Sequence, residues 1–483
     1  MYRKTAKQLP LDEFYTTSNG EFDWNNRWVN LAKLIPWEQF EDQYASKLSQ
    51  SGMGALAKPA RMALGALIIQ ELNSGWSDEE LVLQIQENPY LQYFIGLPKF
   101  QKEPAFNPSM MVYFRKRFDA KTLQAVNEVI CGVKRQKEDS DKSDSDEPPA
   151  DPTGKTNKGI LIVDATCAPA DIRYPTDCSL LNEAREKLEV MIDDLYEPFK
   201  DQMTKPRTYR QKARKDYLNL AKSKKPKPKV IRCATGKQLR YIKRDLKTIG
   251  NLLTKNPDGL SKRQQNELGV IQKLYEQQKT MYDSKTHRVA DRIVSISQPH
   301  VRPIVRGKVA SDTEFGAKIS VSLVNGYAFV DKLSWDNFHE GIELITNIEN
   351  FRRRFGFYPK IVAADKAFRN QDNLRYCKLR GIHINGPMLG RPPKQVDKKQ
   401  RRLERHYEKI RNSIEGKFGE GKRVYGLNRI MAKLKETSES VIMLQFLVMN
   451  LEHKLRVLLY RFFKVLFFGN LSVGFQIKCI IME

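Results

Sequence analysis

Two aspartates of this sequence, Asp164 and Asp365, each follow a short run of bulky apolar residues. The runs 160–163 and 361–364 have the composition of strands that are covered on both faces, which places them inside a sheet. Strand ends are where α/β proteins place their chemistry, and a carboxylate there can act as a ligand. A single aspartate in such a place is more often the cap of the following turn. The repetition of the pattern favours the chemical role for both residues.

A helix predicted over 403–424 carries further reactive side chains on one face. With 100° per residue, a sector of roughly 100° contains a phenol, a guanidinium, a carboxylate and an ammonium. The four residues are Tyr407, Arg411, Glu415 and Lys422.

Helical periodicity leaves open which carboxylate of this helix belongs to a site. Glu404 and Glu408 project close to the same face as Glu415, whereas Glu420 lies well off it. Three candidates therefore remain.

The elements that would position these residues are of mixed α/β type. Residues 318–324 and 327–333 read as two strands, and the Asn325-Gly326 pair between them is a strong hairpin signal because both turn positions need positive φ. A helix is predicted from 338 to 355, where Gly356 can end it. A further helix over 370–380 and a short strand over 382–384 precede the helix that carries Glu415.

The first 135 residues read as helical, followed by an acidic, polar linker over 136–158. Residues 60–72 form a strong helix with a broad apolar face, and Ser77 begins another. Helices joined by tight turns suit either a helix-turn-helix reader of DNA or a dimerisation bundle. Both interpretations remain open for this part of the chain.

The charge of the chain points to a polyanionic partner. Its 483 residues carry a formal net charge of +26, and the excess is greatest within a long helical stretch over 178–295. Between Lys205 and Lys247 there are 17 Lys or Arg residues against two acids, with tyrosines interleaved. This composition favours contact with DNA phosphates, although a charge run is usually only a solvated helix face.

Nothing in the sequence predicts export or a membrane span. The start of the chain has no apolar core of a signal peptide, and the apolar run 457–468 is too short to span and contains Arg461 and Lys464. The six cysteines show no paired spacing. We therefore expect a cytoplasmic protein, with no membrane partner.

In its order of elements the chain resembles the DDE transposases of bacterial insertion sequences, specifically insertion-sequence family five. The motifs that carry the resemblance are Leu161-Ile162-Val163-Asp164-Ala165-Thr166, Tyr174-Pro175-Thr176-Asp177, Val362-Ala363-Ala364-Asp365-Lys366-Ala367-Phe368-Arg369-Asn370, and the residues from Arg411 to Lys422. The resemblance implies a ribonuclease H-like catalytic core (159–177 and 296–430), a helical N-terminal domain (1–135), a basic helical insertion (178–295) and a C-terminal helical region (431–483).

The resemblance also implies roles for single residues. Asp164, Asp365 and Glu415 would be the three catalytic acids and the ligands of two Mg²⁺ ions, for which Mn²⁺ can substitute. Arg411 and Lys422 match the spacing of the family's phosphate-contacting residues on the last helix. The tyrosine of that signature falls on Glu408, one residue after Tyr407, which is a departure from the family pattern.

The implied activity is Mg²⁺-dependent cleavage and joining of the ends of a mobile DNA element. The implied partners are double-stranded DNA, as terminal repeats and as target, and further copies of the chain, in a bacterial, nucleoid-associated location. Two alternatives remain open: a DNA-binding repressor that has lost its chemistry, and a metal-dependent nuclease of the same fold that only hydrolyses.

Overall fold

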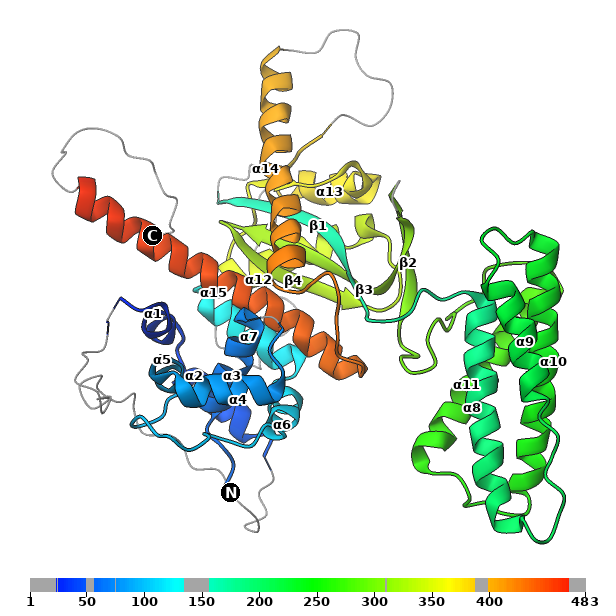
Figure 1. Ribbon diagram of the computed structural model, residues 1–483. Coiled ribbons are helices and arrows are strands. Elements are labelled where there is room, and N and C mark those ends of the chain that lie inside the picture. Colours follow the sequence, from blue (N-terminus) through cyan, green and yellow to red (C-terminus); the bar gives the residue numbers. More distant parts are fainter. Residues whose placement is uncertain are drawn as a thin grey trace, which may run out of the picture. The chain divides into compact units, whose positions relative to one another are not determined.

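The computed structural model describes residues 23, 25–48, 56–73, 75–133, 156–308, 311–386 and 398–468 (Figure 1). These residues form two compact units. Unit 1 contains the described residues of Met1–Ala168, Lys318–Ser334 and Phe338–Glu483, and unit 2 contains those of Pro169–Ala317 and Trp335–Asn337. Most of the predicted linker 136–158 lies outside the described residues, as does the end of the chain from residue 469.

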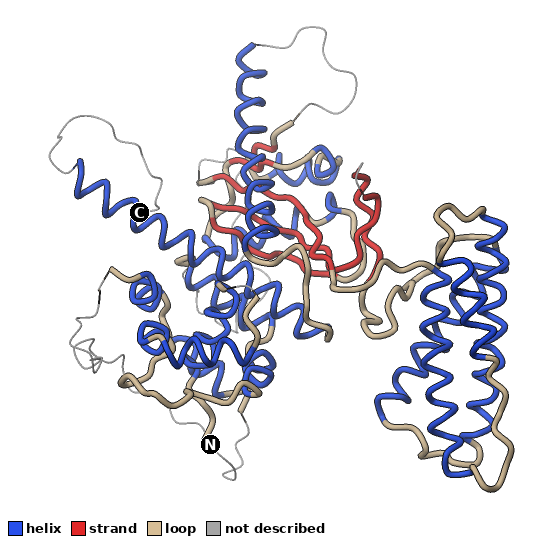
Figure 2. Tube along the Cα trace, viewed as in Figure 1, coloured by secondary structure: helices blue, strands red, loops and turns tan. Residues whose placement is uncertain are grey.

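A six-stranded, curved sheet forms the centre of the α/β part (Figure 2). Its strands are β1 (Ile160–Pro169), β2 (Arg302–Lys308), β3 (Ser311–Val324), β4 (Tyr327–Ser334), β5 (Ile361–Ala363) and β6 (His383–Ile384). Their order is β2-β3-β1-β5-β6, and β4 pairs with β3. β1, β5 and β6 are parallel, whereas β3 is antiparallel to β2 and to β4.

β1 is longer than its apolar run predicts. The sequence places Asp164 at the end of a strand, but β1 continues to Pro169, so that Asp164 lies inside it. Residues 165–168 are buried, and Ala170 still donates a backbone hydrogen bond to Phe315 of β3. The extension follows from this pairing, because β3 continues alongside β1 beyond the point where the short β5 ends.

The predicted hairpin between β3 and β4 is confirmed, and its turn residues have the required backbone conformation. Asn325 has φ 51° and Gly326 has φ 84°, values that glycine and asparagine adopt at the lowest cost. A Cβ at position 326 would also overlap the ring of His453. Glycine is therefore needed there for both conformation and space.

Helices connect and cover the strands in unit 1. They are η3 (Glu340–Ile342), α12 (Leu344–Phe355), η4 (Lys366–Phe368), α13 (Gln371–Leu379), α14 (Lys398–Val424) and α15 (Lys435–Phe468). The helix predicted from residue 338 is divided into η3 and α12, and Gly356 ends it with φ 80° as predicted. Leu161 and Val163 of β1 join Leu344 and Ile348 of α12 in one buried apolar cluster.

The N-terminal helices also belong to unit 1. They are α1 (Arg27–Leu34), α2 (Glu38–Ala45), α3 (Ala60–Leu72), α4 (Asp78–Glu87), α5 (Pro89–Phe94), α6 (Met110–Arg117) and α7 (Ala120–Ile130). α3 is the central one, since Ala60 and every residue from Met62 to Ile69 are buried. The oxygen of Ser77 accepts a hydrogen bond from the amide of Glu80, which begins α4 as predicted.

A buried ionic cluster joins α7, β4 and α12. Arg354 donates hydrogen bonds to Glu128 (Nε to Oε1, 2.9 Å) and to Asp331 (Nη1 to Oδ1, 2.6 Å). The side chains of Arg354 and Asp331 are 1% and 0% exposed. A buried charge is tolerated only when it is paired and hydrogen-bonded, and this arrangement satisfies that condition across three elements.

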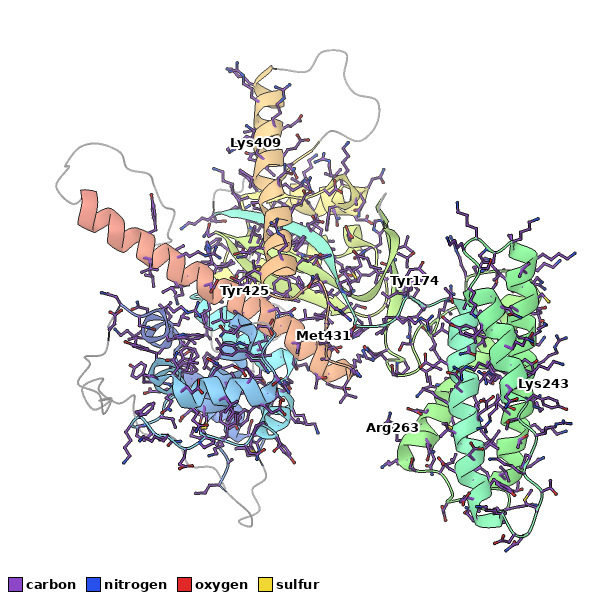
Figure 3. All side chains as sticks on the ribbon, viewed as in Figure 1. Tyr174, Lys243, Arg263, Lys409, Tyr425 and Met431 are labelled. Carbon is purple, nitrogen blue, oxygen red and sulfur yellow. The ribbon has the colours of Figure 1, made fainter. Side chains whose placement is uncertain are left out.

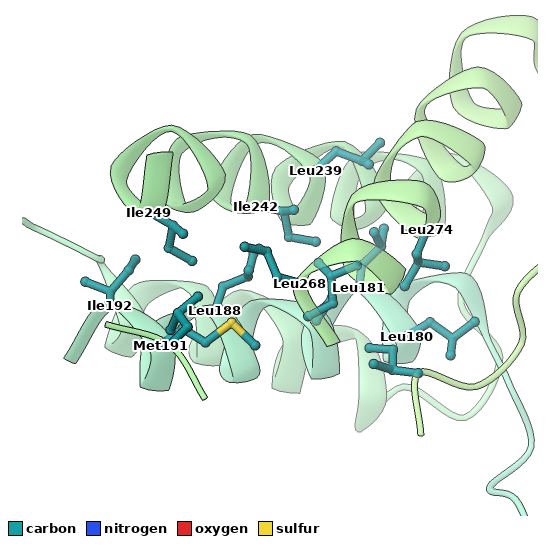
Figure 4. Packing of buried hydrophobic residues seen from close by; sticks show 14 of the residues in the cluster. Leu180, Leu181, Leu188, Met191, Ile192, Leu239, Ile242, Ile249, Leu268 and Leu274 are labelled. Atoms are coloured by element: carbon teal, nitrogen blue, oxygen red, sulfur yellow. The ribbon is translucent and has the colours of Figure 1, made fainter. Parts of the chain in front are cut away.

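Unit 2 contains a bundle of helices with a hydrophobic core of its own (Figure 4). Its helices are α8 (Asp177–Tyr196), η2 (Glu197–Phe199), α9 (Arg210–Ala221), α10 (Pro228–Leu253) and α11 (Lys262–Ser284). Leu181 and Leu188 of α8 pack with Ile242 and Ile249 of α10 and with Leu274 of α11. The insertion predicted from the sequence thus contains buried apolar residues as well as its many charges.

Within the described residues, none of the helices combines the length and the apolar character needed to cross a membrane.

Candidate active site

The parallel pairing of β1 with β5 brings Asp164 and Asp365 to the same level of the sheet. Ile160, Leu161 and Ile162 pair with Ile361, Val362 and Ala363. Asp164 follows two residues later within β1, and Asp365 follows two residues later just beyond the end of β5. Neighbouring strands lie about 4.8 Å apart, so the two residues are neighbours across the sheet.

Both carboxylates accept a local backbone hydrogen bond. The Oδ1 atom of Asp164 accepts from the amide of Ala165 at 2.8 Å, and that of Asp365 accepts from the amide of Lys366 at 2.7 Å. Asp365 also caps η4. The capping role that we considered for a lone aspartate is therefore real for Asp365, and it fixes the direction of the carboxylate.

Asp164 lies among charged side chains. Burial raises the pKa of Asp164 to about 6, against the hydrogen bond from Ala165. The negative charges of Glu340 and Asp365 raise the pKa further, whereas the positive charge of Arg411 lowers it. The structure thus gathers three carboxylates and one guanidinium close enough to act on one another.

The face of β1 that carries Asp164 is the face that α14 covers. Ile160, Ile162 and Asp164 alternate along β1 and therefore share one face. Ile160 and Ile162 line a cavity of about 580 Å³ together with Ile410, Ser413 and other residues of α14. The helix that carries Arg411 and Glu415 therefore lies on the same side of the sheet as Asp164.

Glu415 is linked to Asp164 through Arg411. The Nη1 atom of Arg411 lies 3.2 Å from Oε1 of Glu415, one helical turn away, and the side chain of Glu415 is 58% exposed. The structure therefore joins Arg411 electrostatically to Asp164 and pairs it with Glu415. Lys422 is partly buried on α14, about 10 Å along the helix axis from Glu415 by the rise of an α-helix.

The other carboxylates of α14 have different surroundings. The charge of Glu404 acts on Arg369 and on His383 of β6, and Glu408 is exposed. Glu420 forms ion pairs with Lys417 at 2.9 Å and with Arg456 at 2.5 Å.

Tyr407, which lies beside the position of the family's tyrosine, is buried against β6. Its side chain is 8% exposed, and its ring centroid lies 5.5 Å from that of His383. The presence of a tyrosine at this position is therefore explained by packing against β6.

Glu340 is a charged neighbour of Asp164 that the sequence did not single out. It lies on η3, and its Oε1 atom is 3.0 Å from the ammonium of the nearly buried Lys318. A Cβ at Gly341 would overlap the carbonyl oxygen of Ala367, so η3 packs closely on η4, which Asp365 caps. The glycine after Glu340 is the sequence signal of this approach, but nothing in the sequence distinguishes Glu340 from Glu343.

The acids at this site are the donor type that Mg²⁺ prefers, because hard oxygen ligands hold this ion without removing all its water. The repulsion that Asp365 and Glu340 exert on Asp164 is also what a divalent cation would relieve. Among the residues described, however, no group of three or more acids, histidines or cysteines is arranged to hold a metal ion. The fit to a metal therefore rests on the chemistry of the two aspartates.

Comparison with known proteins places two segments of the chain in transposase families. Residues 18–117 match the sequence model of a family described as a transposase domain, and residues 362–452 match that of a family described as a transposase DDE domain. The second match contains Asp365, Arg411, Glu415 and Lys422 and begins after Asp164.

One curated relative adds to this result. The chain is 30% identical over 163 residues to the uncharacterised protein ORF8 in the nfe locus of Rhizobium meliloti, which covers 33% of this chain and 70% of the relative. The search of solved structures gave no significant match. From the two matched domains and this relative we conclude that the chain belongs to the DDE transposases of insertion sequences.

Proposed function

We propose that this transposase cleaves the ends of its own DNA element and joins them to target DNA by two-metal phosphoryl transfer, with Asp164, Asp365 and Glu415 as catalytic acids. The observation that carries the proposal is the pairing of β1 with β5, which brings Asp365, just beyond the end of β5, close enough for its charge to act on Asp164. Two carboxylates that lie far apart in the chain and close together in the fold support this proposal.

The order of the elements supports a ribonuclease H-like core. After β1 and the helices of unit 2, the chain continues with β2, with the antiparallel pair β3 and β4, with α12, with β5 parallel to β1, with α13, with β6, and then with α14. We propose on this ground that the catalytic core is ribonuclease H-like and that the chain is a member of insertion-sequence family five.

We assign metal binding to the three acids and contact with DNA phosphates to the two cations of α14. Asp164, Asp365 and Glu415 would hold two Mg²⁺ ions, for which Mn²⁺ can substitute, and the bound ions would activate the attacking oxygen and stabilise the leaving one. Glu415 would have to leave its pair with Arg411 to reach them. Arg411 and Lys422 would then contact DNA phosphates near the scissile bond.

Two successive displacements at phosphorus account for the products. In the first, water attacks the phosphorus at the element end, the bond to the 3′ oxygen breaks, and a 3′-hydroxyl is released. In the second, that hydroxyl attacks a phosphorus of the target and displaces a 3′ oxygen there. Two element ends must be held together for joining, so we propose a homo-oligomer on double-stranded DNA.

The test is the Asp164→Asn variant, with duplexes that carry the ends of the element and a target plasmid in Mg²⁺. We expect it to bind the ends and to lose both cleavage and strand transfer, and we expect the same of Asp365→Asn. Asp372→Asn, at an exposed aspartate in the first turn of α13, serves as the control and should keep both activities. Undiminished cleavage by Asp164→Asn would overturn the proposal.

The same assay separates the remaining alternatives. If the wild type releases free ends without any joined product, the chain acts as a hydrolytic nuclease. If it binds the ends and cleaves nothing, it acts as a repressor.

A further inference from the structure

The helices of unit 2 differ sharply in charge. α10 carries seven Lys or Arg residues and one acid, whereas α8, which packs beside it, carries six acids and two basic residues. A surface that served only solubility would have its charges of both signs interspersed. Here the positive charges are concentrated on one part of the unit.

The two acids of the basic stretch 205–247 are used within the fold. Asp245 is 0% exposed beside Arg244, and burial raises its pKa to about 6. Asp216 accepts hydrogen bonds from Lys237 and from the hydroxyl of Tyr241, each at 2.9 Å. Neither carboxylate therefore offsets the outer charges.

Four cations of α10 form a stripe along its outer side: Lys229, Arg240, Lys243 and Lys247. All four are exposed, and by helical periodicity they lie about 100° or more around the helix from the buried Ile242 and Ile249. No carboxylate among the described residues is paired with any of the four. Figure 3 shows Lys243 pointing away from the helices of the unit.

The stripe has the dimensions of a backbone contact. From residue 229 to residue 247 it extends about 27 Å along the helix axis. Double-stranded DNA presents one negative charge per about 1.7 Å of its own axis, so a straight stripe of this length meets many phosphates.

The loop between α9 and α10 continues the stripe. It contains exposed lysines at positions 222, 224, 225 and 227, and Pro226 and Pro228 restrict its backbone. Lys227 is the N-cap of α10 without a side-chain hydrogen bond, and the first turn contains no acid. Because the helix dipole disfavours cations at an N-terminus, this arrangement costs stability unless an anion is present.

We propose that this face of unit 2, formed by Lys229, Arg240, Lys243, Lys247 and the loop 222–228, binds the phosphate backbone of double-stranded DNA without reading its sequence. The inference rests on the proposed function and assigns the insertion to holding the DNA. Cations that meet phosphates release condensed counterions, so the affinity depends steeply on salt.

The test compares two triple variants of the full-length chain. Arg240→Gln, Lys243→Gln and Lys247→Gln remove three charges of the stripe, and Lys255→Gln, Lys262→Gln and Lys273→Gln remove three exposed charges elsewhere in unit 2. Binding to a 40-base-pair duplex of arbitrary sequence is measured by fluorescence anisotropy in EDTA at several KCl concentrations. The melting temperature of each variant shows whether it is folded.

We expect the stripe variant to bind about tenfold or more weakly at 0.1 M KCl and the control variant to bind like the wild type. The slope of log K against log salt should fall by about 2 to 3 in the stripe variant, since each lost phosphate contact removes about 0.9. Equal affinities of the two variants, or no binding by the wild type, would overturn the inference. The inference would also be overturned if the stripe variant bound DNA like the wild type and lost only its binding to vesicles of anionic phospholipid, because the stripe would then contact a membrane surface.

Failure of the proposed function gives a different result. Binding in EDTA needs neither metal nor cleavage, so the stripe variant can lose affinity even if Asp164→Asn still cleaves DNA. In that case the catalytic proposal fails and the DNA-binding face stands. If the stripe variant binds DNA like the wild type and Asp164→Asn is inactive, the DNA-binding face fails and the catalytic proposal stands.

Discussion

Asp164 of β1 and Asp365, two residues beyond the end of the neighbouring parallel strand β5, follow the same register, although the whole of unit 2 lies between them in the chain. β1 continues past this level while β5 ends just before it. The end of β5 leaves Asp365 free to turn into η4 with its carboxylate fixed by the amide of Lys366.

The first prediction distinguishes the carboxylates around Asp164. Glu415→Gln should lower cleavage of element ends by about a hundredfold or more, because loss even of a residue that only supports a metal ligand commonly costs about 10- to 100-fold. Glu408→Gln, at an exposed position of the same helix, is the matched control and should cleave like the wild type. The measurement is the rate of cleavage in Mg²⁺, together with Mn²⁺ binding followed by electron paramagnetic resonance. A full loss in Glu404→Gln or Glu340→Gln, with Glu415→Gln active, would reassign the third acid.

The second prediction concerns the contact between η3 and η4. Gly341→Ala should lower the melting temperature and reduce cleavage, since the added Cβ would overlap the backbone oxygen of Ala367 next to Asp365. Gly416→Ala on α14 is the control, because a Cβ there meets nothing within 4 Å. It should stabilise the helix by about 0.5 to 1 kcal/mol. Equal behaviour of the two variants would show that the two turns do not position the site.

The third prediction tests the buried cluster of Arg354. Arg354→Met should lower the free energy of unfolding by about 3 to 5 kcal/mol, because it leaves Glu128 and Asp331 buried without their cation. Arg353→Met removes the next residue, whose side chain is 57% exposed and lies 3.2 Å from the same Glu128. This control should cost less than about 1 kcal/mol. Urea unfolding of both variants checks the difference, and similar losses would contradict it.

The fourth prediction is a pH dependence of stability that arises at Glu71. Burial raises its pKa from 4.5 to about 7, and a hydrogen bond from Gln445 of α15 opposes the shift. Between pH 4.5 and 7 the unfolded chain loses this proton while the folded chain keeps it. The contribution of Glu71 to stability is therefore complete below pH 4.5 and is lost as the pH rises through 7.

Glu71→Gln should remove this dependence, because the amide imitates the protonated acid. Allowing for the partial exposure of the side chain, the variant should gain about 2 kcal/mol over the wild type between pH 5 and pH 8. Urea unfolding of both proteins at the two pH values measures this gain. A constant difference between them would show that Glu71 ionises alike in both states.

The sequence by itself determined the elements and the residues that could do chemistry. The apolar run before Asp164, the Asn325-Gly326 turn and the periodicity of the helices are local signals, because a buried strand, a type I′ turn and an amphipathic helix each leave their pattern within a few residues. The same local pattern, an apolar run followed by an aspartate, indicated both Asp164 and Asp365.

Only the tertiary structure decided where β1 ends, which side chains of α14 are buried, and which further acid lies near Asp164. β1 is extended by its pairing with β3, Tyr407 is buried against His383, and Glu340 is brought in by the packing of η3 on η4. Each of these results depends on contacts between residues far apart in the chain. Periodicity along one helix or strand carries no information about the element that packs against it, and so it could not supply them.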